Sequence, residues 1–179
     1  MVEKQAKYPQ HSYEQQIITI SLIVNGKEQK LQVEATKRLV DILREDFTLT
    51  GTKISCEIGR CGACSVLMDE KLVNSCLVRA YQLDEKEIVT IEALSQNGLH
   101  PIQKAFLEEG GYQCGYCTPG MIMAVKALLE KNPVPDDEQI HDALSGNLCR
   151  CTGYGGIIRS IQKLRSMGTD FSSRYGPKQ

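Results

Sequence analysis

The sequence predicts an α+β chain in which a small sheet crossed by one helix is followed by a helical half. Apolar residues alternate with polar ones up to about residue 93, and beyond it they recur every three to four residues. The eight cysteines form two sets of four, one in each half. Because 179 residues suffice for two small domains, we expect a loose leader at residues 1–16, a first domain at 17–92, a helical domain at 93–166 and a loose tail at 167–179.

The first half carries the period of two that is typical of strands. Apolar and polar residues alternate on both sides of Asn25-Gly26, which predicts a β-hairpin over residues 18–33. A short helix is predicted over residues 39–47, where four apolar side chains share one side. The other expected elements of this half are a second hairpin over residues 65–74 and a strand over residues 88–91.

The second half contains four segments with helical periodicity, each bounded by a start and a stop signal. The starts are His100-Pro101, Thr118-Pro119, Asp136 with Gln139 as a capping box, and Gly155-Gly156; the stops are Gly110-Gly111, Asn132-Pro133, Gly146 and the polar residues after Ser166. Four short helices of this kind predict a compact bundle.

The first cysteine set has the spacing of a plant-type 2Fe–2S site. Its members are Cys56, Cys61, Cys64 and Cys76, in the pattern C-x4-C-x2-C followed by a gap of eleven residues. The hairpin in that gap would return the chain so that Cys76 lies across from Cys64. Gly59 and Gly62 would allow backbone N–H groups to approach the sulfurs. Zinc fits this spacing poorly, because zinc sites usually pair cysteines as C-x2-C.

The second cysteine set is Cys114, Cys117, Cys149 and Cys151, a C-x2-C pair followed by a C-x-C pair. Spacing alone leaves both zinc and iron–sulfur open for this set. Both pairs precede predicted helices, whose N-termini stabilise thiolates. A C-x-C pair bridges poorly as a disulfide, so a disulfide framework is disfavoured.

Composition and charge exclude several other classes. The 21 basic and 22 acidic side chains give a formal charge of −1, so no basic face for nucleic acid is implied. No segment approaches the ~18 apolar residues of a membrane span, and the first sixteen residues lack an apolar signal core. We therefore expect a cytoplasmic protein, where clustered cysteines indicate metal or redox sites.

The residues around both cysteine sets resemble the iron–sulfur subunit of the molybdenum hydroxylases, the xanthine dehydrogenase family. The stretches that carry the resemblance are TGTK at 50–53, GACSVL at 62–67, NSCL at 74–77, QCGYCTPG at 113–120 and GNLCRCTGY at 146–154. The resemblance extends from about residue 17 to about residue 164. Ser55 departs from it, since the family more often has glycine before the first cysteine.

Membership would imply an N-terminal ferredoxin-like β-grasp domain and a C-terminal four-helix bundle domain, each with one 2Fe–2S cluster. The resemblance implies that the helical-domain cluster lies next to the molybdopterin of a large catalytic subunit, with Gln113 and Cys151 on the pterin side. It places the other cluster nearer a subunit that binds FAD. Electrons would pass from molybdenum through the second and then the first cysteine set to FAD or another acceptor.

The leading hypothesis is therefore an electron-transfer subunit of a xanthine dehydrogenase-like complex, which would not turn over substrate alone. No catalytic residues are assigned, because the sequence has no phosphate loop, nucleophile elbow or paired catalytic carboxylates. The alternatives are the same role in an aldehyde, nicotinate or carbon monoxide dehydrogenase, a free-standing ferredoxin-like carrier, and a zinc-stabilised interaction module. Purine oxidation is the expected chemistry of the complex.

Overall fold

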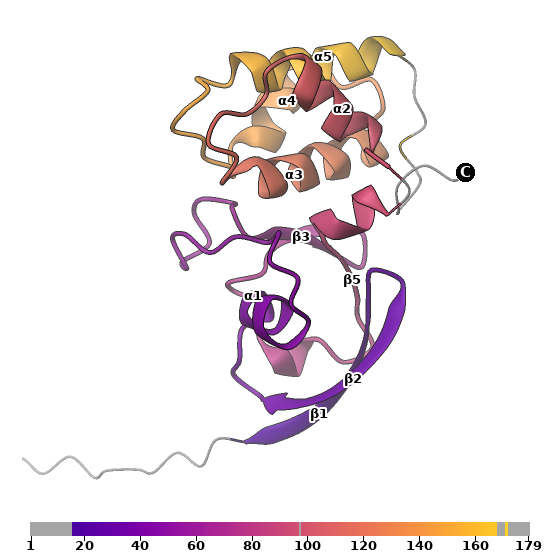
Figure 1. Cartoon of the computed structure of the whole chain (residues 1–179), viewed down its shortest axis with the longest axis vertical. Helices are drawn as coiled ribbons and strands as arrows, with labels where there is room; N and C mark the ends of the chain where they lie inside the picture. The colour runs from indigo at the N-terminus through magenta and orange to yellow at the C-terminus, as the bar shows by residue number, and fades with distance from the viewer. Residues whose placement is uncertain (1–15, 97, 168–170, 172–179) are drawn as a thin grey trace, which may run out of the picture.

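A computed structural model describes residues 16–96, 98–167 and 171 of the chain. Its five-stranded mixed sheet has the order β2-β1-β5-β3-β4 and forms the lower half of the molecule in Figure 1. The strands are β1 (Ile17–Val24), β2 (Lys27–Glu34), β3 (Ser65–Met68), β4 (Lys71–Asn74) and β5 (Glu87–Val89). The fold is α+β, as expected.

Both predicted hairpins are present, with antiparallel pairing between β1 and β2 and between β3 and β4. Their two-residue turns require left-handed backbone, which Asn25 and Gly26 adopt at φ values of 50° and 78°. Asp69 and Glu70 adopt the same region in the second turn, with φ values of 47° and 66°. Strand β5 joins the two hairpins, since it pairs parallel with β1 and antiparallel with β3.

The predicted helix over residues 39–47 is present, although only its first turn is an α-helix. Helix α1 (Leu39–Asp41) continues as a π-helical turn over Ile42–Asp46, in which the Phe47 N–H donates to the Ile42 carbonyl at 3.1 Å. Its apolar side packs against one face of the sheet. The core between them is formed by Ile20, Leu22, Val24, Val33, Leu39, Ile42, Leu43, Val66, Val78, Ala80, Leu83 and Ile88.

Strand β5 ends at Val89, before the predicted end at residue 91, because Thr90 forms hydrogen bonds with the Asn25 side chain instead of with a neighbouring strand. The Thr90 N–H donates to Asn25 Oδ1 at 2.8 Å, and Asn25 Nδ2 donates to the Thr90 hydroxyl at 2.9 Å. The chain then turns into a 3-10 helix at Ile91–Ser95; another one covers Ala80–Gln82. Neither 3-10 helix was predicted.

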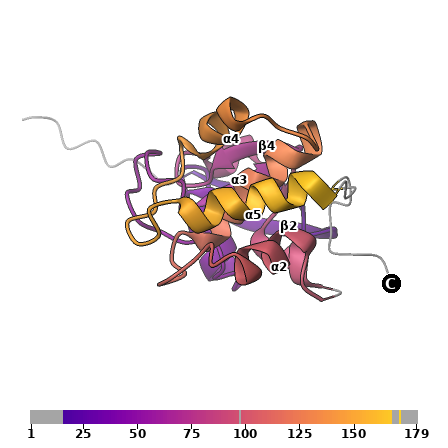
Figure 2. The same ribbon diagram turned by 90° about the horizontal axis from the view of Figure 1, so that it is seen from above.

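All four predicted helices are present and lie above the sheet half. They are α2 (Pro101–Glu108), α3 (Thr118–Lys131), α4 (Asp137–Leu144) and α5 (Gly155–Met167). Helix α5 crosses the top of this layer, with α2 and α4 on either side and α3 beneath it (Figure 2). Asp136 and Gln139 form the expected capping box of α4, with bonds of 2.8 and 3.1 Å.

The sheet and the helices share a hydrophobic core. Neighbouring residues of one strand point to opposite faces, so Val66 and Ile88 pack against α1 while Leu67 and Val89 pack against the helical half. Helix α3 contacts both β3 and β4. The middle of the sheet is therefore buried on both faces, which explains the unbroken apolar run in β3.

Two expectations concern the ends of the chain. Nearly all of the predicted leader, residues 1–16, lies outside the described residues, as does most of the predicted loose tail. Phe171, which we placed in that tail, is instead buried in the helical core, because its large apolar ring gains from leaving water. Within the described residues, none of the helices has the length and apolarity needed to cross a bilayer.

His100 is the N-cap of α2, as the predicted helix start at His100-Pro101 requires. Its Nδ1 accepts a hydrogen bond from the Ile102 N–H at 3.2 Å. The residue is buried, with only 3 % of its surface exposed. Burial, together with the positive charge of Lys126, lowers the pKa of His100 to about 4.

This buried imidazole predicts acid sensitivity. Between its unfolded pKa of about 6.5 and about 4, the unfolded chain binds a proton that the folded chain excludes, so the free energy of unfolding falls as pH falls. At pH 5 the loss due to His100 would be ~2 kcal/mol relative to pH 7. Urea titrations of the wild type and His100→Asn, which keeps a capping side chain, should show this difference only in the wild type. Parallel pH dependences would contradict the assignment.

Candidate metal centres

The loop before β3 and the residue pair after β4 bring the first cysteine set together. The hairpin pairs Ser65 with Asn74, and the Ser75 N–H donates to the Cys64 carbonyl at 3.2 Å. Cys64 and Cys76 are therefore neighbours in one buried cluster, at 3 % and 2 % exposure. Cys56 and Cys61 are only partly buried.

The four thiols interact as two pairs. Cys61 lies close enough to Cys56, and Cys64 close enough to Cys76, to influence the pKa of Cys56 and of Cys76. Hydrogen bonding from backbone N–H groups, foremost that of Ile58, lowers the pKa of Cys56 to about 7. Burial raises the pKa of Cys76 to about 11. One pair therefore lies on the solvent side of the site and the other on the core side.

Positive backbone angles direct N–H groups at the sulfurs of this loop. Glu57, Gly59 and Gly62 have φ values of 59°, 74° and 68°. The Arg60 N–H donates to Cys56 Sγ at 3.3 Å, and the nearby Gly59 backbone acts to lower the pKa of Cys76. Asn74 fixes the loop from the hairpin, since its Nδ2 donates to the Gly59 carbonyl at 3.0 Å. The expected approach of backbone donors to sulfur is present.

The second cysteine set lies at one end of the helical layer. Cys117 is the N-cap of α3, with Cys114 just before it, and Cys149 and Cys151 lie on the loop that leads into α5. Cys114 Sγ and Cys151 Sγ are 3.7 Å apart and both residues are exposed. Cys117 lies close enough to Cys149 for that neighbour to raise its pKa, and both residues are partly buried. The structure thus divides this set into two pairs as well.

The less exposed pair, Cys117 and Cys149, has unequal proton affinities. Burial raises the pKa of Cys117 to about 12. Burial also acts to raise the pKa of Cys149, but hydrogen bonds from the Thr152 hydroxyl and nearby backbone N–H groups outweigh it and lower that pKa.

The donors fit a two-iron cluster in each set. A 2Fe–2S cluster takes four thiolates, two on each iron, which matches the two pairs of thiols in each set. All eight cysteines are free thiols. Among the described residues, no three His, Cys, Asp or Glu side chains form a site for one metal ion.

Hydrogen bonds join the two cysteine loops, which lie on the same side of the molecule (Figure 1). The Leu148 N–H, next to Cys149, donates to the Cys61 carbonyl at 2.9 Å. Asn147 Nδ2 donates to the Gly62 carbonyl at 3.1 Å, in a buried position. A cysteine loop of one half is therefore in direct contact with a cysteine loop of the other.

Two glycines permit this contact. A Cβ at Gly62 would lie 2.4 Å from Asn147 Nδ2, and a Cβ at Gly120 would lie 2.1 Å from the Gly62 carbonyl oxygen. Such distances are far inside van der Waals contact. Any side chain at either position would push the first cysteine loop away from α3 and Asn147.

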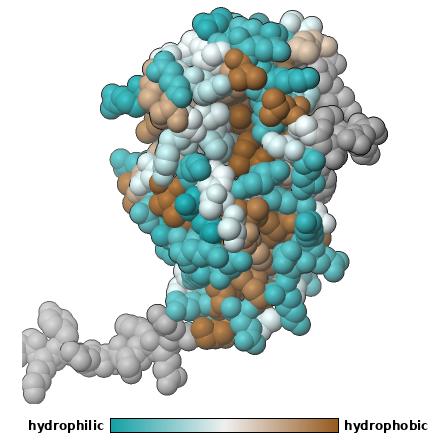
Figure 3. Space-filling view, in the orientation of Figure 1, coloured by the Kyte–Doolittle hydropathy of each residue, from teal (hydrophilic) through white to brown (hydrophobic). Residues whose placement is uncertain are grey.

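The surface around the second set is open and partly apolar. Gln113 is exposed beside Cys114, whose sulfur contacts that of Cys151, so the two residues expected on the pterin side lie near one another. Tyr116 and Leu148 are 50 % and 57 % exposed. Apolar areas are visible on both halves of the molecule in Figure 3.

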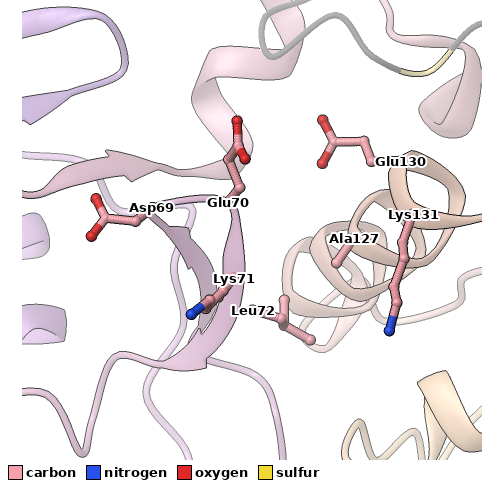
Figure 4. Close-up of a pocket in the computed structure, with 7 residues that line it drawn as sticks. All are labelled: Asp69, Glu70, Lys71, Leu72, Ala127, Glu130 and Lys131. Atoms are coloured by element: carbon pink, nitrogen blue, oxygen red, sulfur yellow. The ribbon is translucent and has the colours of Figure 1, made fainter.

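A pocket of about 590 Å³ lies away from both cysteine sets. The β3–β4 hairpin and the C-terminal turns of α3 line it, with the side chains of Glu70 and Glu130 on opposite sides (Figure 4). No cysteine lines it. It therefore has no part in holding the thiols.

Sequence reasoning missed the residues that support the cysteines. The Tyr154 hydroxyl accepts from the Cys149 N–H at 3.0 Å and donates to the Asn147 carbonyl at 2.9 Å. The roles of Asn147, Gly120 and Thr152 were not predicted. Their only signal was adjacency to the cysteine motifs, which does not reveal contacts across the chain.

Two family models match the chain. The model described as 2Fe-2S iron-sulfur cluster binding domain matches residues 22–98, and the one described as 2Fe-2S binding domain matches residues 90–162. A probable xanthine dehydrogenase subunit of Bacillus subtilis is 57 % identical over 80 % of this chain and 83 % of its own. The small FeS subunit of nicotinate dehydrogenase from Eubacterium barkeri is 53 % identical over 81 % and 93 %.

Solved structures show the same fold. The chain superposes on part of quinoline 2-oxidoreductase from Pseudomonas putida 86 with a TM-score of 0.81 and 42 % identity, over 86 % of this chain and 96 % of the matched one. It also superposes on the aldehyde oxidoreductase of Desulfovibrio gigas with a TM-score of 0.80 and 38 % identity. That superposition covers 89 % of this chain but only 18 % of the longer protein.

The junction between the loops predicts a stability effect at Asn147. Asn147→Ala removes the buried side-chain donor to the Gly62 carbonyl, which keeps the Ser65 N–H as its other donor, and the loss of this hydrogen bond should lower the free energy of unfolding by about 0.5–1.5 kcal/mol. Asn132→Ala is the matched control, because its hydrogen bonds are exposed and remain within the helical half. Chemical denaturation measures both. An effect at Asn147 no larger than that of the control would show that the junction contributes little.

Proposed function

Because the chain belongs to the 2Fe–2S small subunits of the molybdenum hydroxylases, we propose that its two cysteine sets carry electrons from a molybdopterin subunit to a flavin subunit or another acceptor. The role as electron-transfer subunit of an oxidoreductase complex follows from its relatives, among them iron–sulfur subunits of nicotinate dehydrogenase and aldehyde oxidoreductase. The observation that carries the proposal is the gathering of eight thiols into two sets of four at one junction.

The proposed ligands of the first cluster are Cys56, Cys61, Cys64 and Cys76, and those of the second are Cys114, Cys117, Cys149 and Cys151. A bound 2Fe–2S cluster supplies one-electron chemistry at thiolate-held iron. The chain's own residues hold the thiols in pairs, direct backbone N–H groups at Cys56, and bury Cys64 and Cys76 away from water. These contacts favour the negative charge of sulfur-bound iron.

The proposal includes the division of the chain into a ferredoxin-like β-grasp domain at residues 17–92 and a four-helix bundle domain at 93–166. The matched ranges of the two family models, which overlap only at residues 90–98, support this division. Contacts of α2 with α5 and of α3 with α4 support the bundle. Because the core is shared, the two units would pack as close neighbours.

We place the molybdopterin subunit against the exposed side of the second set, where Gln113 and Cys151 would contact the pterin. The exposure of Gln113, Cys114 and Cys151 supports this position, since a partner can reach all three. The flavin subunit would approach the partly buried Cys56 and Cys61. The Cys61–Leu148 hydrogen bond gives a short connection from one ligand loop to the other. We place the whole assembly in the cytoplasm.

The proposed substrate class of the complex is a purine. The support is the 57 % identity to the probable xanthine dehydrogenase subunit of Bacillus subtilis. Relatives named for nicotinate, nicotine, caffeine and aldehydes are 39–53 % identical, so sequence similarity in this subunit separates the substrate classes only weakly. Substrate contacts would lie on the large subunit.

Iron analysis tests the ligand assignment. The wild type should hold about four irons and four sulfides per chain and give two distinct EPR signals on reduction. Cys76→Ser and Cys149→Ser should each lose the signal of one cluster, a different one in each variant, and keep the other. Zinc in place of iron, or loss of both signals in both variants, would rule the assignment out.

The complex itself provides the second part of this test. The chain in cell extract should elute with a molybdopterin-containing subunit on gel filtration, because the second set has an exposed side for it. A lone 19.9 kDa species would instead identify a free-standing carrier.

A further inference from the structure

The hydroxyl of Thr152 is hydrogen-bonded to a sulfur of the second cysteine set. Thr152 Oγ1 lies 3.2 Å from Cys149 Sγ as a donor, and it accepts the Tyr154 N–H at 3.2 Å. A hydroxyl has one proton to donate and two lone pairs with which to accept. Because the backbone donor occupies the acceptor side, the proton is directed at sulfur.

The surrounding loop holds this geometry in place. Tyr154 has a φ of 63°, and its own hydroxyl bridges the Cys149 N–H and the Asn147 carbonyl at 3.0 and 2.9 Å. Thr152, Tyr154 and Cys149 are all partly buried, so water competes little for the hydroxyl. The donor is therefore part of a connected network rather than a mobile surface group.

The second cysteine set receives a side-chain donor in addition to backbone N–H groups. Cys56 receives the backbone N–H of Arg60, which no substitution other than proline removes. Among the described residues other than cysteine, Thr152 has a side chain that donates a hydrogen bond to a sulfur of either cysteine set. A side-chain donor can be removed by substitution without changing the backbone, so the hydrogen bonding of this set can be changed without affecting the other set.

We infer that Thr152 raises the reduction potential of the cluster held by the second set and so makes it the better electron acceptor for the catalytic subunit. The inference rests on the proposed function. A donor to a thiolate withdraws charge from iron and stabilises the reduced form, which carries one more negative charge, more than the oxidised form. The step is the transfer of one electron from the molybdenum subunit, and Thr152 keeps its proton throughout.

The test is an EPR-monitored redox titration of the complex with Thr152→Val, which has the same shape without the donor. The potential of the second cluster should become more negative by about 60 mV, equivalent to a tenfold change in a one-electron equilibrium. Thr152→Ser retains the hydroxyl and should keep the wild-type potential. The potential of the first cluster should be unchanged in both variants.

A positioning role alone would give different results. Tyr154→Phe loosens the same loop without removing the donor to sulfur, so an equal shift in Tyr154→Phe and Thr152→Val would overturn the inference. An unchanged potential in Thr152→Val would do so as well. If Thr152→Val loses iron, Thr152→Ala replaces it, and iron loss in both would assign Thr152 to cluster retention instead. Absence of clusters in the wild type would overturn the proposed function, which this comparison distinguishes from the role of Thr152.

Discussion

The close approach of the Gly62 carbonyl to helix α3 and to Asn147 is the constraint on which the arrangement of both cysteine sets depends. There is no room for a Cβ at Gly62 or at Gly120, and the Asn147 amide gives the Gly62 carbonyl a second donor beside the Ser65 N–H. The contact therefore requires glycine at positions 62 and 120, and the Asn147 hydrogen bond stabilises it further. It brings the Cys61 carbonyl within hydrogen-bond distance of the residue before Cys149.

The shared core supports this junction from behind. Strand β3 directs Val66 to the α1 side and Leu67 to the helical side, so that one strand belongs to both cores. Cys64 precedes this strand directly, and Cys117 caps the helix that packs on it. An electron-transfer protein gains from such an arrangement, because rigid elements fix the separation of its two redox sites.

Local signals predicted most of the elements and the members of both cysteine sets. Asn25-Gly26, the Asp136–Gln139 capping box and His100-Pro101 each act within a few residues, and the structure contains the hairpin and helices that they indicate. Contacts over long sequence separations were not predictable. The end of β5 depends on Asn25, 65 residues away from Thr90, and the partner of Asn147 is 85 residues away from it. Burial of Phe171 likewise depends on a core assembled from distant helices.

The most direct measurement is anomalous diffraction at the iron edge from crystals of the intact chain. The account predicts two separate pairs of iron atoms, one bounded by Cys56, Cys61, Cys64 and Cys76 and the other by Cys114, Cys117, Cys149 and Cys151, on either side of the Gly62–Asn147 contact. A single ion within either set, or sulfurs joined to one another instead of to iron, would contradict it.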